Sequence, residues 1–504
     1  MDAEQPAPGA GTNRALLSIA AVLATLLYTI DTTIAAVALP HMQGSLQANQ
    51  DQIAWVLTSY IVVSAISTPL SGWFGARFGL RRVLTISVAG FTIASMMCGL
   101  AENLTQMVMF RGLQGAFGAA LVPLSQVVLL DAFPKEEYGR ATGLWGMGVM
   151  VGPIIGPTLG GYLTDTLSWR WAFYINVPVG IVAYLGILLA MPKVRHAAGK
   201  HFDMTGFILL SLAIGLLQLW LDRGQTLDWF ESIEITTEVF FSALFFYMFV
   251  VHTFTRRHSF VDLALLKDRN FVVAVGMMFA IGLAVISPSV LLPNFLQQLQ
   301  GYTPTQAGQL MAVRGFTAII SMLVAGRLVG RVSTRLLIAT GIVLTGGSLW
   351  IMALFNVDTP WQWVAWSGAI QGLGVPLTFV PLSVVAYATL KKEQRAEAGA
   401  LLTLVRNIGS SVGISMVVAL LARSTQMNQS YLTEHFTAFD TNRWQMLGGL
   451  PGTNEHTAAF MTEIARQAAA IGYSNSFFLL MVTAIVALPL VLVLKPERKS
   501  GPAT

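Results

Sequence analysis

One aspartate and one arginine lie inside long apolar stretches of this chain, where ionisable side chains are rare. Asp31 lies in the stretch 15–39, and Arg111 lies in the stretch 105–131. A charged side chain at the centre of a bilayer costs about 2.5–3.5 kcal/mol on insertion scales, so such residues are candidates for function. At 1.5 Å per residue, Asp31 lies about 12 Å and Arg111 about 9 Å from the predicted outer ends of their helices. These similar depths predict that the two side chains face one another.

A carboxyl group that faces a guanidinium at this depth could take up and release a proton. Burial in a low dielectric favours the neutral form of the carboxyl group, whereas a nearby guanidinium favours its ionised form. We therefore expect Asp31 to carry a coupling proton and Arg111 to tune its release. The alternative is a structural ion pair that only fixes helix packing.

Five further side chains are candidates for a substrate cavity. The two arginines among them lie in apolar stretches without an obvious acidic partner. They could bind an anionic substrate group or a backbone carbonyl, or they could snorkel or cap a helix end. Methionine is deformable and suits the recognition of varied apolar compounds. The five candidates are Gln114, Trp145, Met150, Arg314 and Arg406.

Glycines at four-residue spacing mark the apolar stretch 141–163. This spacing places them on one helix face, where another backbone can approach closely, and the prolines between them remove hydrogen bonds and bend the helix. A bent, smooth helix could act as a sliding surface or a seal between two halves. Ordinary packing of small residues is the alternative. The residues are Gly148, Gly152, Pro153, Gly156, Pro157 and Gly160.

A short connection rich in glycine and arginine follows the stretch 53–75. The enrichment of basic residues in cytoplasmic loops explains some of these residues. Their spacing recurs later in the chain, so we expect the turn to act as a conformational latch against neighbouring helix ends. The latch residues are Gly72, Arg77, Gly79, Arg81 and Arg82.

The composition places these residues in a membrane protein. The chain has 504 residues, of which 54% are hydrophobic and 11% charged, with a mean hydropathy of +0.64. Soluble domains carry about 25% charged residues, so most of this surface must face lipid. The single cysteine, Cys98, excludes an intramolecular disulfide and a cysteine-based metal cluster. The net charge of +5 does not indicate nucleic acid, because the positions of the basic residues explain it.

Fourteen stretches reach the length of about 20 apolar residues that a membrane-spanning helix needs. A helix satisfies all its backbone hydrogen bonds internally, so the predicted fold is all-α and polytopic. The stretches lie near 15–39, 53–75, 82–101, 105–131, 141–163, 171–191, 204–221, 234–252, 271–297, 305–328, 335–355, 362–388, 397–423 and 472–494.

Basic residues predict the orientation of these helices. Of the 30 lysines and arginines, 22 lie in the tails and in alternate loops on one face, five lie on the other face and three lie inside spans. Cytoplasmic loops carry the excess of basic residues. We therefore expect both termini, 1–14 and 495–504, to be cytoplasmic and 424–471 to be the one sizeable external loop.

An internal repeat divides the chain. The spacing of Gly72, Arg77 and Arg81 recurs 254 residues later, and Gln114-Gly115 recurs 257 residues later. This offset carries eight spans, of which six form the repeat unit. The sequence therefore predicts an N-terminal six-helix bundle, a linker with two inserted helices and a C-terminal six-helix bundle that work by alternating access. Their limits are 15–191, 192–270 and 271–494.

The motifs resemble those of the major facilitator superfamily, and most closely the fourteen-span drug:proton antiporters of the EmrB/QacA type. The likeness covers nearly the whole chain. One departure is that Ala76 stands where the family's loop motif has an acidic residue. The motifs are the loop 72–82, Arg111 to Gly118, the glycine- and proline-rich run 148–161 that is typical of exporters, and Asp31 to Ile34 with Ala38 to Pro40.

The resemblance implies proton-coupled export of hydrophobic or amphipathic toxic compounds, without enzymatic activity. The chain has no Gly-x4-Gly-Lys-Ser/Thr loop for ATP phosphates, so we expect a proton gradient to supply the energy without cofactor or metal. One alternative is an exporter of lipids, fatty acids or a specific metabolite on the same scaffold. A less favoured one is a respiratory proton-channelling subunit, which would need mid-span lysines that are absent here.

The same resemblance implies a location and partners. Emr-type proteins are multidrug efflux subunits of the bacterial inner membrane that work with a periplasmic adaptor and an outer-membrane channel. We expect the substrates to be small hydrophobic drugs and protons, and no nucleic acid to bind. The polar segment 424–471 is a candidate docking site for the adaptor, and the alternative is a mobile loop.

Overall fold

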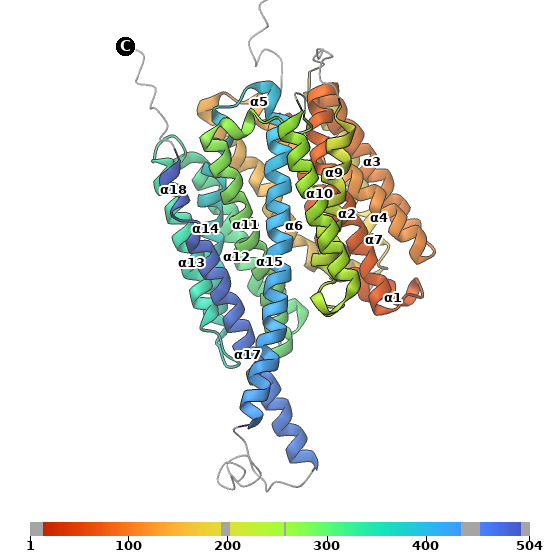
Figure 1. Cartoon of the computed structure of the whole chain (residues 1–504), viewed down its shortest axis with the longest axis vertical. Helices are drawn as coiled ribbons and strands as arrows, with labels where there is room; N and C mark the ends of the chain where they lie inside the picture. Colours follow the sequence, from red (N-terminus) through yellow and green to blue (C-terminus); the bar gives the residue numbers. More distant parts are fainter. Residues whose placement is uncertain (1–13, 193–201, 257–258, 435–453, 495–504) are drawn as a thin grey trace, which may run out of the picture.

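The computed structural model describes residues 14–192, 202–256, 259–434 and 454–494. Fourteen of its helices are long and apolar enough to cross a membrane, which confirms the predicted number. They run side by side in a bundle whose long axis is vertical in Figure 1.

The N-terminal half supplies six of these spans. Two of them are broken, since α4 and α5 follow one another across a turn at Ala119–Ala120, and the short α7 leads directly into α8. The helices are α1 (Arg14–Ser45), α2 (Gln50–Phe78), α3 (Leu80–Leu100), α4 (Leu104–Gly118), α5 (Leu121–Ala132), α6 (Tyr138–Thr166), α7 (Trp171–Tyr174) and α8 (Asn176–Ala190), with a 3-10 turn at Lys135–Glu137.

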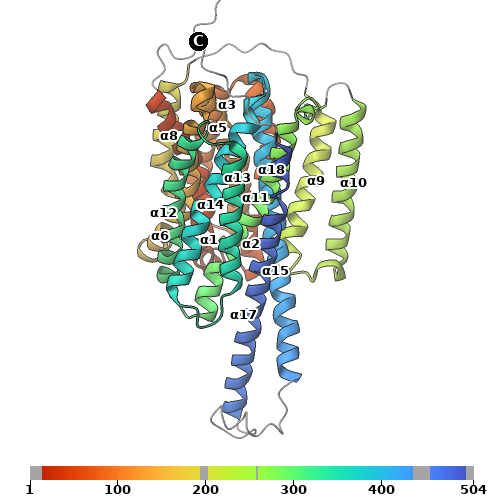
Figure 2. The same ribbon diagram turned by 90° about the vertical axis from the view of Figure 1, so that its left-hand side faces the viewer.

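Two further helices, α9 (Met204–Arg223) and α10 (Ile233–Thr255), are inserted between the halves. They lie at one edge of the molecule in Figure 2. Helix α9 packs against α2 and α15, whereas α10 packs mainly against α9. Short 3-10 turns follow at Trp229–Glu231 and Leu265–Lys267.

The C-terminal half supplies the other six spans. A π-helical segment at Phe295–Leu299 ends the first of them. The helices are α11 (Arg269–Asn294), α12 (Pro304–Leu328), α13 (Thr334–Ala353), α14 (Trp361–Ala388), α15 (Lys392–Glu434), α17 (Asn454–Val486) and α18 (Leu490–Val493).

The two halves share one packing plan. In the N-terminal half α1 packs against α6, α2 against α4 and α3 against α8; the matching pairs in the C-terminal half are α11 with α15, α12 with α14 and α13 with α17. The halves meet where α6 packs on α12 and α2 packs on α15. This arrangement confirms the predicted fold of two six-helix bundles with two inserted helices.

Matching helices also begin in the same way. Asn49 and Gln52 form a reciprocal capping box at the start of α2, and Thr303 and Gln306 form the same box at the start of α12. Each box satisfies two backbone N–H groups that have no partner within the helix. The two boxes lie 254 residues apart, which extends the repeat to the helix ends.

The segment 424–471 differs from the expected loop. Helix α15 continues to Glu434 and α17 begins at Asn454, so both flanks of the segment are helical. The two helices pack against each other and project beyond the rest of the bundle (Figure 2). Hydropathy marks where a polar segment leaves the apolar stretch, but it does not distinguish a polar helix from a loop.

Candidate functional site

The carboxylate of Asp31 lies at the centre of a buried hydrogen-bond cluster in the N-terminal half. Its Oδ2 accepts a hydrogen bond from Arg111 Nη1 at 2.6 Å. Its Oδ1 accepts from Gln114 Nε2 at 2.7 Å and from Asn176 Nδ2 at 3.0 Å. Three helices therefore converge on one carboxylate: α4 with the arginine and the glutamine, α8 with the asparagine and α1 with the aspartate.

The guanidinium of Arg111 has partners besides the carboxylate. Its Nε donates to the carbonyl of Val56 at 3.1 Å, and its Nη1 also donates to Gln114 Oε1 at 2.7 Å. It lies over the ring of Tyr60, 4.1 Å from the ring centroid, and such a stack stabilises a desolvated cation. Arg111 therefore keeps hydrogen-bond partners and the ring contact when Asp31 is neutral.

The cluster is sealed from solvent in this structure. Asp31 is 1% exposed, Arg111 and Gln114 are 0% exposed, and Asn176 is 2% exposed. A low-dielectric surrounding strengthens each of these interactions and makes an unpaired charge costly. A proton that reaches Asp31 would therefore break the ion pair and change how α1 is held against α4.

Asn176 is the member of the cluster that the sequence analysis missed. It is the first residue of α8, and its Nδ2 also donates to Ser95 Oγ of α3 at 3.0 Å. An amide in an otherwise apolar stretch was the available signal, but a lone neutral side chain does not stand out as an ion pair does.

The predicted glycine stripe lies inside the N-terminal half rather than between the halves. Gly148 packs against Val22, Gly152 against Thr29 and Gly156 against Thr33. All three partners lie on α1, and Gly160 meets the same helix. Pro153 is exposed on α6; Pro157 lies on the same helix, but its side chain is outside the described part. The prediction that this stripe forms a surface between the halves is therefore wrong, because the stripe faces α1 of its own half.

Other glycines of α6 form the contact with the C-terminal half. Gly139 and Gly143 abut α12 at Gly326 and Met322, and Gly146 also lies against Met322. No room for a side chain is left where the two backbones meet. Helix α6 thus joins α1 on one face and α12 on another.

The predicted latch lies where the halves meet. Gly72 packs against Glu397 and Ala400 of α15, and Gly75 packs against Ala396 of the same helix. Gly79 has a φ of 88°, a conformation that favours glycine, and links α2 to α3.

Two of the predicted latch arginines differ in their surroundings. Arg81 donates to the carbonyl of Leu188 at 2.8 Å, within its own half, and Arg82 is exposed. Arg77 lies in the last turn of α2.

An ion pair joins the halves at this end of the molecule. Arg395 Nη1 of α15 donates to Asp131 Oδ1 of α5 at 2.6 Å. Nearby, Tyr387 of α14 donates to Gln126 Oε1 at 3.5 Å. Ala76 brings no charge to the turn, and Asp131 supplies a carboxylate that links the halves at this end.

The five substrate-cavity candidates separate in space. Gln114 belongs to the Asp31 cluster, so its assignment to a substrate cavity is not supported by its position. Trp145 of α6 stacks on Phe379 of α14, with 5.9 Å between ring centroids. Both rings belong to one buried apolar cluster, and Met150 packs against that cluster. These two candidates lie at the boundary between the halves.

The two arginine candidates have different partners. Arg314 Nη1 donates to Ser289 Oγ at 3.0 Å, and its Nη2 donates to the carbonyl of Val285 at 2.9 Å. Arg406 lies 5.9 Å from the ring centroid of Phe379. Arg314 is thus bound within the C-terminal half, whereas Arg406 faces the boundary.

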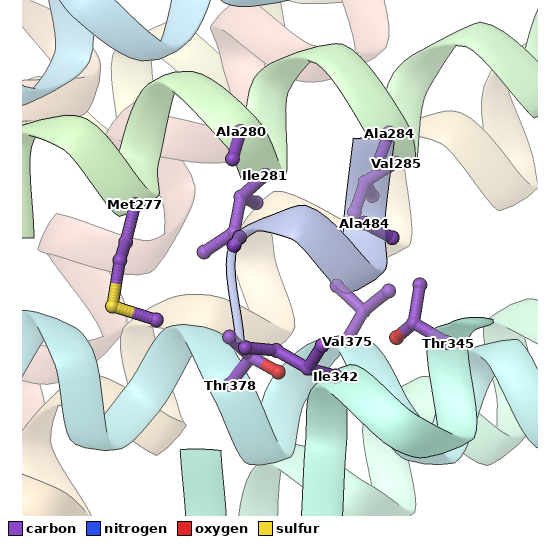
Figure 3. Close-up of a pocket in the computed structure, with 11 residues that line it drawn as sticks. Met277, Ala280, Ile281, Ala284, Val285, Ile342, Thr345, Val375, Thr378 and Ala484 are labelled. Carbon is purple, nitrogen blue, oxygen red and sulfur yellow. The ribbon is translucent and has the colours of Figure 1, made fainter. Parts of the chain in front are cut away.

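A separate cavity lies inside the C-terminal half (Figure 3). Its lining comes from α11, α13, α14 and the end of α17. Its polar groups are the hydroxyls of Thr345 and Thr378 and its walls are otherwise apolar, with Met277, Ile281, Val285, Ile342 and Val375 among them. It carries no charged group and lies apart from the Asp31 cluster. Among the described residues, no three His, Cys, Asp or Glu side chains are grouped so as to hold a metal ion.

Comparison with known proteins identifies the sequence family. The sequence profile of the Major Facilitator Superfamily matches residues 21–414. The chain is 33% identical to the multidrug export protein EmrB of Escherichia coli K12 over 99% of this chain and 98% of that protein. It is 34% identical to the fatty acid resistance protein FarB of Neisseria gonorrhoeae, covering 98% of both chains.

A solved structure shares the fold. The proton:xylose symporter XylE superposes with a TM-score of 0.61 at 13% identity, covering 94% of both chains. This likeness supports the arrangement of helices alone.

Proposed function

The chain belongs to the Major Facilitator Superfamily, and from that premise we propose that it exports hydrophobic or amphipathic toxic compounds in exchange for protons. The similarity to EmrB over the full length supports multidrug export as the activity. The similarity to FarB supports fatty acids as a second candidate class of substrate. The fourteen spans place the protein in a membrane as a multi-pass transporter.

The buried pair of Asp31 and Arg111 is the observation that carries the proton-coupling proposal. Protonation of Asp31 removes the ion pair but leaves the guanidinium with Val56, Gln114 and the ring of Tyr60. The carboxyl group can therefore change charge without leaving Arg111 wholly unsatisfied. This is the property that a proton carrier inside a membrane needs.

Packing supplies a route from this pair to the boundary between the halves. Asp31 lies on α1, which packs closely on the glycine stripe of α6. Helix α6 in turn abuts α12 through Gly139 and Gly143. We propose that the change in charge at Asp31 shifts α1 on α6 and so favours one arrangement of the halves over the other.

The export proposal is tested with inside-out membrane vesicles that have an acidic interior. We expect vesicles with the protein to accumulate an ethidium-like dye, and a proton ionophore to abolish the accumulation. Vesicles without the protein serve as the control. Accumulation of a fatty acid but no dye would favour the second substrate class. Accumulation of neither compound, or accumulation that survives collapse of the gradient, would contradict the proposal.

We also propose that the projecting ends of helices α15 and α17 contact a periplasmic adaptor. The positions of the basic residues predict cytoplasmic termini, and with that orientation these helix ends lie on the external side. Large apolar side chains are exposed on them: Met427 is 72%, Tyr431 59% and Met461 41% exposed. Exposed apolar patches of this kind favour protein contacts. The test is copurification of an adaptor with the wild type and with the double variant Met427→Glu, Tyr431→Glu. Equal recovery of the adaptor with both proteins would contradict this assignment.

A further inference from the structure

Arg406 lies deep in the membrane-spanning part of α15. It follows the first residue of the helix, Lys392, by 14 positions, which is about 21 Å at 1.5 Å per residue. Its backbone carbonyl packs against Gly282 of α11 and accepts a hydrogen bond from Ser410 Oγ at 2.9 Å. At this depth the side chain is too far from the helix end to reach the interface by snorkelling.

No described residue neutralises the charge of Arg406. In the described part of the chain, its guanidinium has neither an ion pair nor a hydrogen bond to another side chain, and it lies 5.9 Å from the ring centroid of Phe379.

Acidic side chains of the described spans have partners other than Arg406. Asp31 pairs with Arg111, Asp131 with Arg395 and Glu238 with Arg223, and Asp222 accepts a hydrogen bond from Thr58. The guanidinium of Arg314 is likewise held by Ser289 and Val285. Of the three arginines that the sequence places inside the spans, Arg111, Arg314 and Arg406, the last is therefore the one without a counter-charge or a carbonyl partner among the described residues.

An unpaired guanidinium inside a membrane protein lowers stability, and an apolar side chain of similar size would avoid that cost. The surroundings of Arg406 suit an amphipathic molecule. Phe379 stacks on Trp145 of α6, and Tyr28, Met147 and Met150 pack against the same apolar cluster. Both halves contribute to this wall, as a substrate site between them would require.

We propose that Arg406 and this aromatic wall recognise amphipathic organic anions, with the guanidinium bound to a carboxylate or sulfonate head and the rings bound to the apolar body. The inference rests on the proposed export function and names its preferred substrate class. An anion supplies the missing counter-charge, whereas a cationic drug of the same size would repel the guanidinium.

The test compares two probes that share an apolar chain and carry permanent, opposite charges. Dodecanesulfonate and dodecyltrimethylammonium are bound at equilibrium to the purified protein in nanodiscs, with empty nanodiscs subtracted. We expect the wild type to prefer the sulfonate. We expect Arg406→Gln to weaken sulfonate binding about ten-fold or more, as loss of a charged hydrogen bond does, and to leave ammonium binding within about three-fold.

Two further variants guard against a merely structural effect. Arg406→Lys retains the charge and should retain the preference for the sulfonate. Arg314→Gln removes an arginine that is bound within the C-terminal half, so it should change the two affinities equally. A wild type that prefers the ammonium, or an Arg406→Gln variant that weakens both probes equally, would overturn the proposal. Failure of the wild type to transport either probe would instead count against the export function, because binding is measured separately.

Discussion

The cores of the two halves differ although their helices pack alike. In the N-terminal half, Gln114 donates to Asp31 and accepts from Arg111. Its repeat counterpart Gln371 is also 0% exposed, but neither its Oε1 nor its Nε2 has a hydrogen-bond partner. The position that matches Arg111 is Gly368. One half therefore contains a carboxylate–guanidinium cluster at this position, and the described part of the other half has no counterpart of that ion pair.

Packing differs at a second pair of matching positions. Phe91 is fully buried in the core of the N-terminal half. Its counterpart 254 residues later is Thr345, which lines the cavity of the C-terminal half. A smaller side chain leaves space that the neighbours do not fill. A duplicated fold can thus keep a buried ion pair in one half while the matching positions of the other half are neutral.

The largest predicted effect comes from breaking the charged cluster. Arg111→Gln leaves Asp31 ionised and without its cation, which should cost about 3–5 kcal/mol of stability. The double variant Asp31→Asn with Arg111→Gln removes both charges and should recover most of that loss. Thermal unfolding of the purified proteins measures both effects. A double variant less stable than Arg111→Gln would contradict the role of the ion pair.

A smaller effect is expected from the packing difference. Phe91→Ala should cost about 3 kcal/mol or more because it opens a cavity in a filled core. Thr345→Val should be tolerated, with a fall in apparent melting temperature of only a few degrees, because it keeps the side-chain volume beside the cavity and opens no new space. Equal destabilisation by the two changes would remove this distinction between the halves.

The smallest predicted effect concerns the two glutamines. Gln114→Leu removes a donor to Asp31 and should cost about 1–3 kcal/mol, whereas Gln371→Leu replaces an unpaired amide and should be neutral or stabilising. Thermal unfolding of the two variants provides the comparison. A Gln371→Leu variant as unstable as Gln114→Leu would show that the C-terminal glutamine is engaged after all.

Much of the fold follows from the sequence, because lipid imposes simple requirements. Apolar length alone gave all fourteen spans, and the recurrence of Gly72, Arg77 and Arg81 gave the two halves. Their similar depth along the helices predicted that Asp31 and Arg111 face each other, and Arg111 Nη1 lies 2.6 Å from Asp31 Oδ2. These predictions needed only helix geometry and the cost of burying charge.

Other features depend on contacts that periodicity does not specify. Four-residue spacing places Gly148, Gly152 and Gly156 on one face, but it does not say that this face meets α1 rather than the other half. Asn176 belongs to the cluster because α8 begins close to Asp31. A single polar residue in the sequence does not reveal where its helix begins relative to the other helices. The helical flanks of 424–471 were missed because a helix outside lipid needs no apolar composition.

Proton movement by Asp31 is the central claim, and a pH-gradient measurement tests it most directly. Proteoliposomes that contain a pH-sensitive dye are given a pH gradient, and an exported compound is then added. We expect the wild type and the exposed-acid control Asp358→Asn to dissipate the gradient when the compound is added. We expect Asp31→Asn to keep the gradient while it still binds the compound. Dissipation by Asp31→Asn at the wild-type rate would show that another group carries the proton.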